Sequence, residues 1–339
     1  PDNYIWIRNA VVDFYKDGFP TNTTWKNIGK IYVIDENLNS IIAPGAQVEK
    51  VADGFSFTEG PVWHPDGYLL FSDPNTNTIY RYNPANHNVT VYMSHSGYTG
   101  ADIGDYRQPG SNGLAVDKEG RLIVAQHGNR RVIRHEKKGP VTVLSDRHDN
   151  KRLNSPNDVV LKSDGTVYFT DPPYGLPGLF NDPKKETAQQ GVYMVKEGKT
   201  ILLATDLGGP NGIAFSPDEK YLYVGNWDIR DIHNTKTVWQ YEVQPDGTLK
   251  NGKVFFNWNL TEDDEAIDGI KVDREGNLFV SAPGGIWIIS AEAKLLGKIV
   301  TPERPANMAW GDDGKTLYMT AHSSLYKIRV TTGGKFSWQ

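Results

Sequence analysis

Apolar and polar positions recur in a fixed order along most of this chain. Each copy opens with a polar residue, runs through a few apolar residues, turns at a polar sequence that usually ends in glycine, and returns through a second apolar run. Acidic–glycine pairs supply the positive φ values that tight hairpin turns need. Each copy therefore predicts a two-stranded β-hairpin. The copies begin at Thr58, Ser111, Pro156, Pro210, Ile267 and, more loosely, Pro305.

We call the polar residue that opens each copy its leader residue. Segments rich in Val, Ile, Tyr and Trp, such as TIYRYNP and GVYMVKEGK, lie between the hairpins and predict further strands. A repeat of about 40 to 50 residues with several strands each is typical of a β-propeller blade. The leaders stand 39 to 57 residues apart, at Glu59, Asn112, Asn157, Asn211, Asp268 and Asn307.

Six copies predict an all-β, six-bladed β-propeller with a central channel over residues 35–339. Residues 1–34 form an N-terminal extension, in which WKNIGKIYVID is expected to add a strand that helps close the ring. Closure matters because an open ring would leave two sheet edges unpaired. The alternative of two packed sandwich domains is disfavoured, because the repeat runs without interruption and no linker is evident.

The leader residues are expected to converge, because the innermost strand of every blade lines the channel of a propeller. Two carboxylates there repel each other, and no Lys or Arg occupies a leader position. The carboxylate and amide oxygens of Glu59, Asn157, Asn211 and Asp268 suit one divalent cation, with Ca²⁺ expected first and Mg²⁺ or Mn²⁺ as alternatives. Zn²⁺ more often comes with His. Asn and Asp can also open turns for folding alone, which is our interpretation of Asn112 and Asn307 as leaders.

Composition narrows the class of protein. The 339 residues carry a net charge of −5 without a basic block, so a nucleic-acid partner is not indicated. No stretch approaches the roughly 18 apolar residues of a membrane span. The absence of cysteine excludes disulfides and thiol nucleophiles. The sequence starts at Pro1 without Met, so we expect a periplasmic or secreted location over a cytoplasmic one. The oligomeric state is left open.

Taken together, TEGPVW, SNGLAVD, RLNSPNDVVLKSDGTVYFTDPPYG and PNGIAFSPDEKYLYV resemble the gluconolactonase branch of the senescence marker protein (regucalcin)/gluconolactonase/luciferin-regenerating-enzyme family. The resemblance covers roughly residues 35 to 330, and the first 34 residues are not typical of the family. It implies a six-bladed propeller with one divalent cation at the channel mouth. The family ligands carry over onto Glu59, Asn211 and Asp268, with Asn157 as a ligand or a substrate contact. It also implies hydrolysis of sugar lactones.

The expected reaction is the opening of an aldonolactone ring by water, with the cation polarising the carbonyl. Asp268 is the candidate general base, or acts only as a ligand. A serine hydrolase is not indicated, since G-x-S-x-G is absent. The alternatives are hydrolysis of other lactones or organophosphorus esters, and a non-enzymatic binding module with a structural cation.

Sugar hydroxyls need polar contacts above the cation. The candidates in this sequence are Asn112, His127, Arg152, Asp158 and Tyr174, with Tyr174 placed to stack on the ring. For His127, a hydrogen-bonded structural histidine is an equal alternative.

Overall fold

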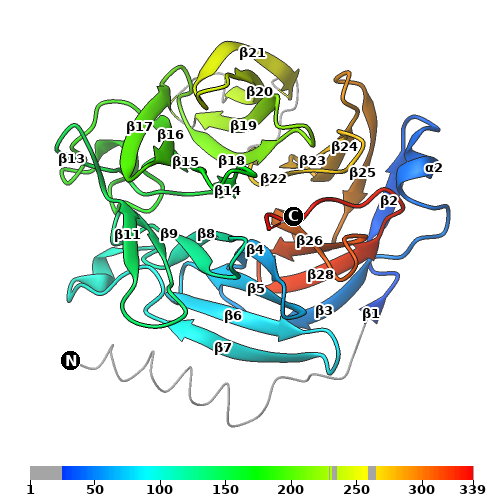
Figure 1. Ribbon diagram of the computed structural model, residues 1–339. Helices are drawn as coiled ribbons and strands as arrows, with labels where there is room; N and C mark the ends of the chain where they lie inside the picture. Colours follow the sequence, from blue (N-terminus) through cyan, green and yellow to red (C-terminus); the bar gives the residue numbers. More distant parts are fainter. Residues whose placement is uncertain (1–24, 229, 231–234, 259–264, 339) are drawn as a thin grey trace.

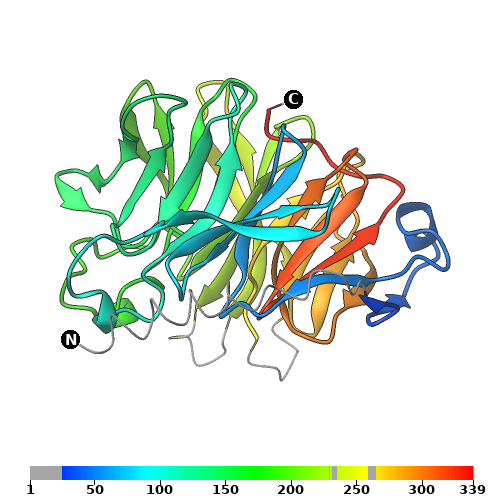
Figure 2. The same ribbon diagram turned by 90° about the horizontal axis from the view of Figure 1, so that it is seen from below.

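The computed structural model describes residues 25–228, 230, 235–258 and 265–338, and shows six twisted sheets arranged around a central axis (Figures 1 and 2). The predicted six-bladed propeller is confirmed. Within every sheet the neighbouring strands are antiparallel. The first strand of each hairpin in the sequence pattern is the innermost strand of a blade, as the repeat requires.

The first four blades follow the sequence in order. Blade one contains β4 (Glu59–His64), β5 (Tyr68–Asp73), β6 (Thr78–Asn83) and β7 (Asn88–Ser94). Blade two contains β8 (Ser111–Val116), β9 (Leu122–Gln126), β10 (Arg131–Arg134) and β11 (Thr142–Ser145). Blade three contains β14 (Val159–Leu161), β15 (Val167–Asp171), β16 (Gly191–Lys196) and β17 (Lys199–Ala204). Blade four contains β18 (Pro210–Phe215), β19 (Tyr221–Asp228), β20 (Thr235–Val243) and β21 (Leu249–Asn257).

The last two blades each take strands from the N-terminal region. Blade five contains β22 (Ile270–Val272), β23 (Leu278–Ala282), β24 (Gly285–Ile289), β25 (Leu295–Val300) and β2 (Lys30–Val33). Blade six contains β26 (Pro305–Gly311), β27 (Thr316–Ala321), β28 (Ser324–Arg329), β3 (Glu49–Asp53) and β1 (Trp25–Lys26). The smaller elements are the hairpin of β12 (Arg147–His148) and β13 (Lys151–Arg152), the helix α2 (Leu38–Ile41), and two 3₁₀ turns at Ile103–Asp105 and Leu179–Asn181.

The strand that joins the two ends of the ring is β3. It pairs with β28, for example Ala52 opposite Leu325, so residues just before blade one complete blade six. The WKNIGKIYVID segment contributes β1 and β2 instead, which lie at the outer edges of blades six and five. This order follows from chain length, because β3 directly precedes blade one and reaches its neighbour without a long connection. Residues 1–24 of the predicted extension lie outside the described residues.

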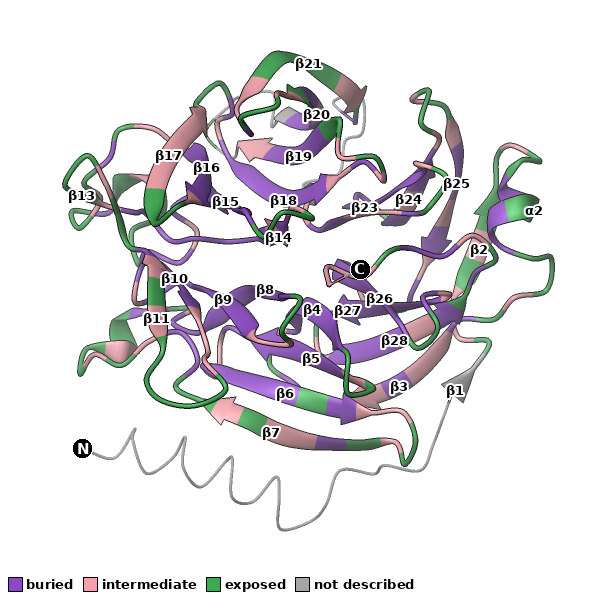
Figure 3. Cartoon of the chain, viewed as in Figure 1, coloured by how far each residue is buried: buried purple, intermediate pink, exposed green. Residues whose placement is uncertain are grey.

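The inner strands are buried on both faces, as Figure 3 shows for β4, β8 and β18. Large aromatic residues fill the space between blades; Trp63 stacks on Tyr318 with ring centroids 5.8 Å apart. Removal of this apolar surface from water is the main force that holds adjacent blades together. None of the helices in the described ranges is long and apolar enough to cross a membrane.

Candidate active site at the channel mouth

Close contact between neighbouring inner strands explains why glycine follows most leader residues. The Gly113 N–H donates to Asn157 O at 2.7 Å, so one inner strand lies directly against the start of the next. A Cβ on Gly212 would come within 2.2 Å of Asp268 O. Only glycine fits at such a position, and the leader residues are therefore fixed side by side around one mouth of the channel.

The structure corrects the predicted alignment of the last repeat by one residue. The Gly269 N–H donates to Ala306 O at 2.9 Å, which matches the bond from Gly113 to the leader Asn157. Ala306, rather than Asn307, is therefore the leader of the sixth repeat. Asn307 instead matches Asp158, because in both residues Oδ1 accepts the N–H of the next residue. The sixth copy lacks the glycine that marks this register in most of the others.

Two carboxyl groups from blades one and five meet at the mouth. Glu59 is 2% exposed and accepts hydrogen bonds from the Gly60 N–H and, at 3.4 Å, from Asn307 Nδ2. The Asp268 carboxyl lies near Glu59 and Asn211, whose side chains both act to lower its pKa. The structure thus brings together three of the four predicted ligand side chains, although their repeats are far apart in sequence.

Burial and repulsion make this carboxyl pair difficult to ionise. Burial, followed by the charges of Asp268 and Asp158, raises the pKa of Glu59 well above its ordinary value, and Lys271 opposes that rise. Burial also raises the pKa of Asp268 to about 6, against the lowering effect of Arg304. A positive charge between the two carboxyl groups would remove both penalties.

The amide groups beside the pair leave oxygen atoms unused. Among the described residues, the buried Oδ1 atoms of Asn112 and Asn157 accept no hydrogen bond. Asn157 Nδ2 lies 3.4 Å from His127 Nε2, an orientation that keeps its Oδ1 away from the histidine. Buried acceptors without a partner cost stability unless something else binds them. Carboxylate and amide oxygens together fit a hard divalent cation.

The composition of the donor set restricts the type of metal centre. Across the described ranges, no three His, Cys, Asp or Glu side chains gather in a way that could hold a metal ion. A cation at this mouth would therefore depend on the amide oxygens of Asn157 and Asn211 as well as on the two carboxylates. Such an oxygen set suits Ca²⁺, Mg²⁺ or Mn²⁺ better than Zn²⁺.

His127 is fully buried and packed against the loop that carries Tyr174. A Cβ on Gly175 would lie 2.4 Å from His127 Cβ. Burial lowers the pKa of His127 to about 4, so the ring is neutral at ordinary pH. A neutral ring can hold the Asn157 amide in one orientation, which gives His127 a positioning contact beside the mouth.

Tyr174 and Arg152 have different surroundings. The Tyr174 hydroxyl donates to Trp227 O at 2.6 Å, and burial and then the nearby charge of Asp268 raise its pKa. Tyr174 therefore stands beside the carboxyl pair. Arg152 lies on β13, and its guanidinium donates to Asn129 O at 2.9 Å. Among the described residues, no hydrogen bond or ion pair joins Arg152 to the leader residues.

Asp158 directly follows the leader Asn157 in the sequence and is 2% exposed. Its Oδ1 and Oδ2 accept the N–H groups of Val159 and Ile213, at 2.9 and 3.3 Å. Both oxygens thus face protein groups. Sequence reasoning missed two cations near the site, Lys271 and Arg304. The sequence does distinguish Lys271. It stands three positions after its leader, where each of the other five repeats has Val or Ala.

The fold and the site together define a six-bladed propeller whose inner strands present acids and amides at one mouth. The chain belongs to the family described as the SMP-30/gluconolactonase/LRE-like region, whose model matches residues 57–323. It is 36% identical over 326 residues to a gluconolactonase from Zymomonas mobilis, covering 92% of this chain and 89% of that protein. The predicted family resemblance is confirmed.

Solved structures agree with this assignment. A gluconolactonase from Xanthomonas campestris superposes with a TM-score of 0.78 at 28% identity, covering 92% of this chain and 98% of the other. A calcium-binding regucalcin from Agrobacterium tumefaciens gives a TM-score of 0.67 over 85% of this chain and 95% of its own. At 16% identity, the second likeness shows the fold alone.

Proposed function

We propose that this protein is a lactonase that opens sugar lactones of the gluconolactone type by attack of water. One observation carries the proposal: the carboxyl groups of Glu59 and Asp268 meet beside buried amide oxygens at a single channel mouth. The similarity to a gluconolactonase over nearly the whole chain supports the choice of substrate class. Propellers host many functions, so the site rather than the fold selects this one.

The residues of the mouth divide the work. Glu59, Asn157, Asn211 and Asp268 would hold a divalent cation, which when bound polarises a lactone carbonyl and stabilises negative charge on its oxygen. Asp268 accepts a proton from water as the water oxygen bonds to the carbonyl carbon, and a proton passes to the ring oxygen as the ester bond breaks. The product is the open-chain hydroxy acid. As a ligand, Asp268 would be a weaker base, and its alternative role is to bind only.

Side chains around the pair would orient the substrate. Asn112 has an unused amide oxygen, and Tyr174 presents an aromatic ring beside Asp268. His127 acts through Asn157, because its ring contacts that amide. Asp158 and Arg152 have other partners, and their proposed contacts with sugar hydroxyls would require a substrate that reaches past the leader residues.

A lactone with a more apolar body is the second candidate. Aromatic rings gather on one side of the mouth, where Tyr174 lies 5.8 Å from Trp227 and 6.1 Å from Phe180 between ring centroids. The chain is also 26% identical to the lactonase drp35 of Staphylococcus epidermidis, over 80% of this chain and 75% of that protein. An aromatic wall binds a hydrophobic ring as readily as the apolar face of a sugar.

A substrate and metal panel tests the proposal. Five- and six-carbon aldonolactones and an aliphatic lactone would be assayed with Ca²⁺, Mg²⁺, Mn²⁺ or Zn²⁺ after treatment with a chelator, with correction for spontaneous hydrolysis. We expect sugar lactones to be opened fastest, and Ca²⁺, Mg²⁺ or Mn²⁺ to restore activity at least a hundredfold. A stripped sample that opens gluconolactone as fast as the reloaded one would refute the role of the cation.

A further inference from the structure

A lysine side chain lies inside the channel just below the carboxyl pair. Lys271 belongs to β22, the inner strand of blade five, and its side chain is only 24% exposed. Its Nζ donates to Ile270 O at 3.0 Å and to Asn307 Oδ1 at 3.3 Å, and lies 4.0 Å from Asp158 Oδ2. The ammonium group is thus surrounded by protein oxygens, as a bound ion would be.

Charge is unusual at this level of the channel. The residue three positions after the leader lines the same cavity in all six repeats. It is Lys271 in blade five, and in the other five repeats it is small and apolar. The other five are Val62, Ala115, Val160, Ala214 and Ala309. Burying an ammonium group among such residues is costly unless it is paired. The exception therefore calls for a partner, and Asp158 is the carboxylate within reach.

Four charged groups act on one another at this end of the channel. Glu59 is influenced by Asp268, Asp158 and Lys271. With the three carboxylates and the lysine ionised, their sum is −2, which one divalent cation would neutralise. Arg304 also acts on Asp268, but its guanidinium is 37% exposed and pairs with Glu265 at 3.8 Å, so solvent and that acid weaken its part in the balance.

We propose that Lys271 is a positioning residue that serves as the permanent counter-ion of Asp158, and so leaves the Glu59–Asp268 pair as the place for a single divalent cation. The inference rests on the proposed function for the identity of that cation. Asn307 extends the effect, because its Oδ1 accepts from Lys271 while its Nδ2 donates to Glu59. Lys271 therefore both balances one acid and orients the amide that holds another.

Calorimetric titration of chelator-treated protein with Ca²⁺ alone tests the charge balance. Lys271→Met keeps much of the side-chain volume and removes the charge, so it should bind Ca²⁺ at least tenfold more tightly than the native protein. Asp158→Asn, with the lysine left unpaired, should bind Ca²⁺ at least tenfold more weakly. The double variant should return to within about threefold of the native affinity, and Lys271→Arg, the matched control, should stay near it.

Two results would overturn the counter-ion role: unchanged or weaker binding by Lys271→Met, or shifts of the same sign in both single variants. If the native protein bound no divalent cation, the proposed function would fail, and thermal unfolding without metal would decide about Lys271. Lys271→Met should then unfold at a lower temperature than the native protein, with most of the loss recovered in the double variant. An unchanged midpoint in Lys271→Met would contradict the pairing.

Discussion

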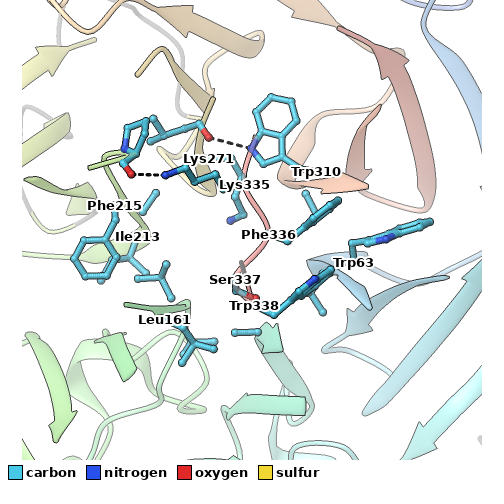
Figure 4. Close-up of a pocket in the computed structure, with 18 of the residues that line it drawn as sticks. Trp63, Leu161, Ile213, Phe215, Lys271, Trp310, Lys335, Phe336, Ser337 and Trp338 are labelled. Atoms are coloured by element: carbon cyan, nitrogen blue, oxygen red, sulfur yellow. Dashed lines mark hydrogen bonds between the residues drawn. The ribbon is translucent and has the colours of Figure 1, made fainter. Parts of the chain in front are cut away.

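The two mouths of the channel are formed by the same six inner strands, but their chemistry is opposite. At the leader end, the buried Glu59 and the partly exposed Asp268 carry charges that Lys271 and Arg304 offset only in part. At the far end, a cavity of about 400 Å³ is lined mostly by apolar side chains, among them Trp63, Leu161 and Trp310, with Lys271 as one of its few charged residues (Figure 4). Lys271 lies between the two environments.

The C-terminal segment covers the far end. Lys335 Nζ donates to Pro217 O at 2.8 Å and Ser337 Oγ donates to Val116 O at 2.5 Å, so the segment connects blades four and two across the axis. Trp338 stacks on Phe336 with ring centroids 4.6 Å apart and packs against the apolar clusters of blades one and two. Figure 1 shows the C-terminus at the centre of the ring.

This difference separates the residues that hold the ring together from those that carry chemistry. Apolar burial at the far end stabilises the assembled blades, whereas the acids at the leader end are costly to ionise, a penalty that the proposed cation would offset. The acids of the candidate site therefore lower the stability of the fold at one mouth of the channel, and apolar packing at the other mouth offsets this loss of stability.

The largest expected effect is loss of catalysis at the leader end. Glu59→Gln and Asp268→Asn should each lower kcat/KM for gluconolactone by about a thousandfold or more, because each would remove a charge that holds the proposed cation and Asp268 is also the proposed general base. Hydrolysis corrected for the spontaneous rate measures the loss. The unfolding midpoint without metal should not fall.

The control for this pair is an acid from the same repeats that lies in a hairpin turn and pairs with Lys162 at 3.6 Å. Asp164 accepts the Thr166 N–H at 2.9 Å in the hairpin turn of blade three. Asp164→Asn should keep kcat/KM within about twofold. Comparable losses in Asp164→Asn and Asp268→Asn would mean that the convergence at the mouth is irrelevant to activity.

An intermediate effect is expected on stability at the far end. Trp338→Ala should lower the free energy of unfolding by about 1–3 kcal/mol, because a partly buried aromatic ring and its stacking partner lose contact. Urea unfolding measures this change. Lys335→Ala, at an exposed position of the same segment, should change stability by less than about 1 kcal/mol.

The comparison also requires that Trp338→Ala leave catalysis intact. At 25 °C, kcat/KM of the folded variant should stay within about twofold of the native value, since the channel separates Trp338 from the carboxyl pair. A large loss of activity in a folded Trp338→Ala protein would show that the two mouths are coupled.

The smallest expected effect is a pH dependence of the metal-free protein. Burial raises the pKa of Asp268 from 3.8 to about 6, so the folded state binds a proton more tightly than the unfolded state. Stability from this group is present at low pH and is lost as pH rises through about 6. The midpoint of the chelated protein should fall by a few degrees between pH 4.5 and 7.5.

Asp268→Asn should reduce this pH dependence and leave the part that comes from Glu59 and Asp171, whose pKa values burial also raises. Saturating Ca²⁺ should oppose the fall. Scanning calorimetry at several pH values with and without Ca²⁺ measures both effects. A native midpoint that rises steadily with pH in the presence of chelator would mean that the carboxyl pair is not strained by its burial.

Much of the fold could be predicted because every blade repeats one local pattern. The turn glycines and the leader residues fix the period, and pseudo-symmetry then places Glu59 and Asp268 near one axis without knowledge of any contact. The leader of the sixth repeat was predicted wrongly, because a shift of one residue between Ala306 and Asn307 leaves the apolar pattern unchanged. The hydrogen bond from Gly269 and the pairing of Pro305 with Ala321, which matches that of Pro210 with Asn226, reveal the shift.

The rest of the site depends on side-chain directions that the pattern does not encode. Asp158 and Lys271 lie near each other because two different inner strands both face the channel, and nothing local to either strand indicates the pairing. Arg152 is a predicted contact for sugar hydroxyls, yet on the β12–β13 hairpin its guanidinium donates to Asn129 O. The roles of the predicted ligands and substrate contacts remain predictions.

The pairing of β3 with β28 has a consequence for synthesis on the ribosome. The three inner strands of blade six follow the other five blades in the sequence, so the ring closes only after all five of those blades have been made. Until then Glu59 and Asp268 lie in the first and the last blade of an incomplete ring. The two acids of the candidate active site are therefore brought together in one late step of folding. A polypeptide that stops before blade six would contain both acids, but the ring that holds them side by side would not close.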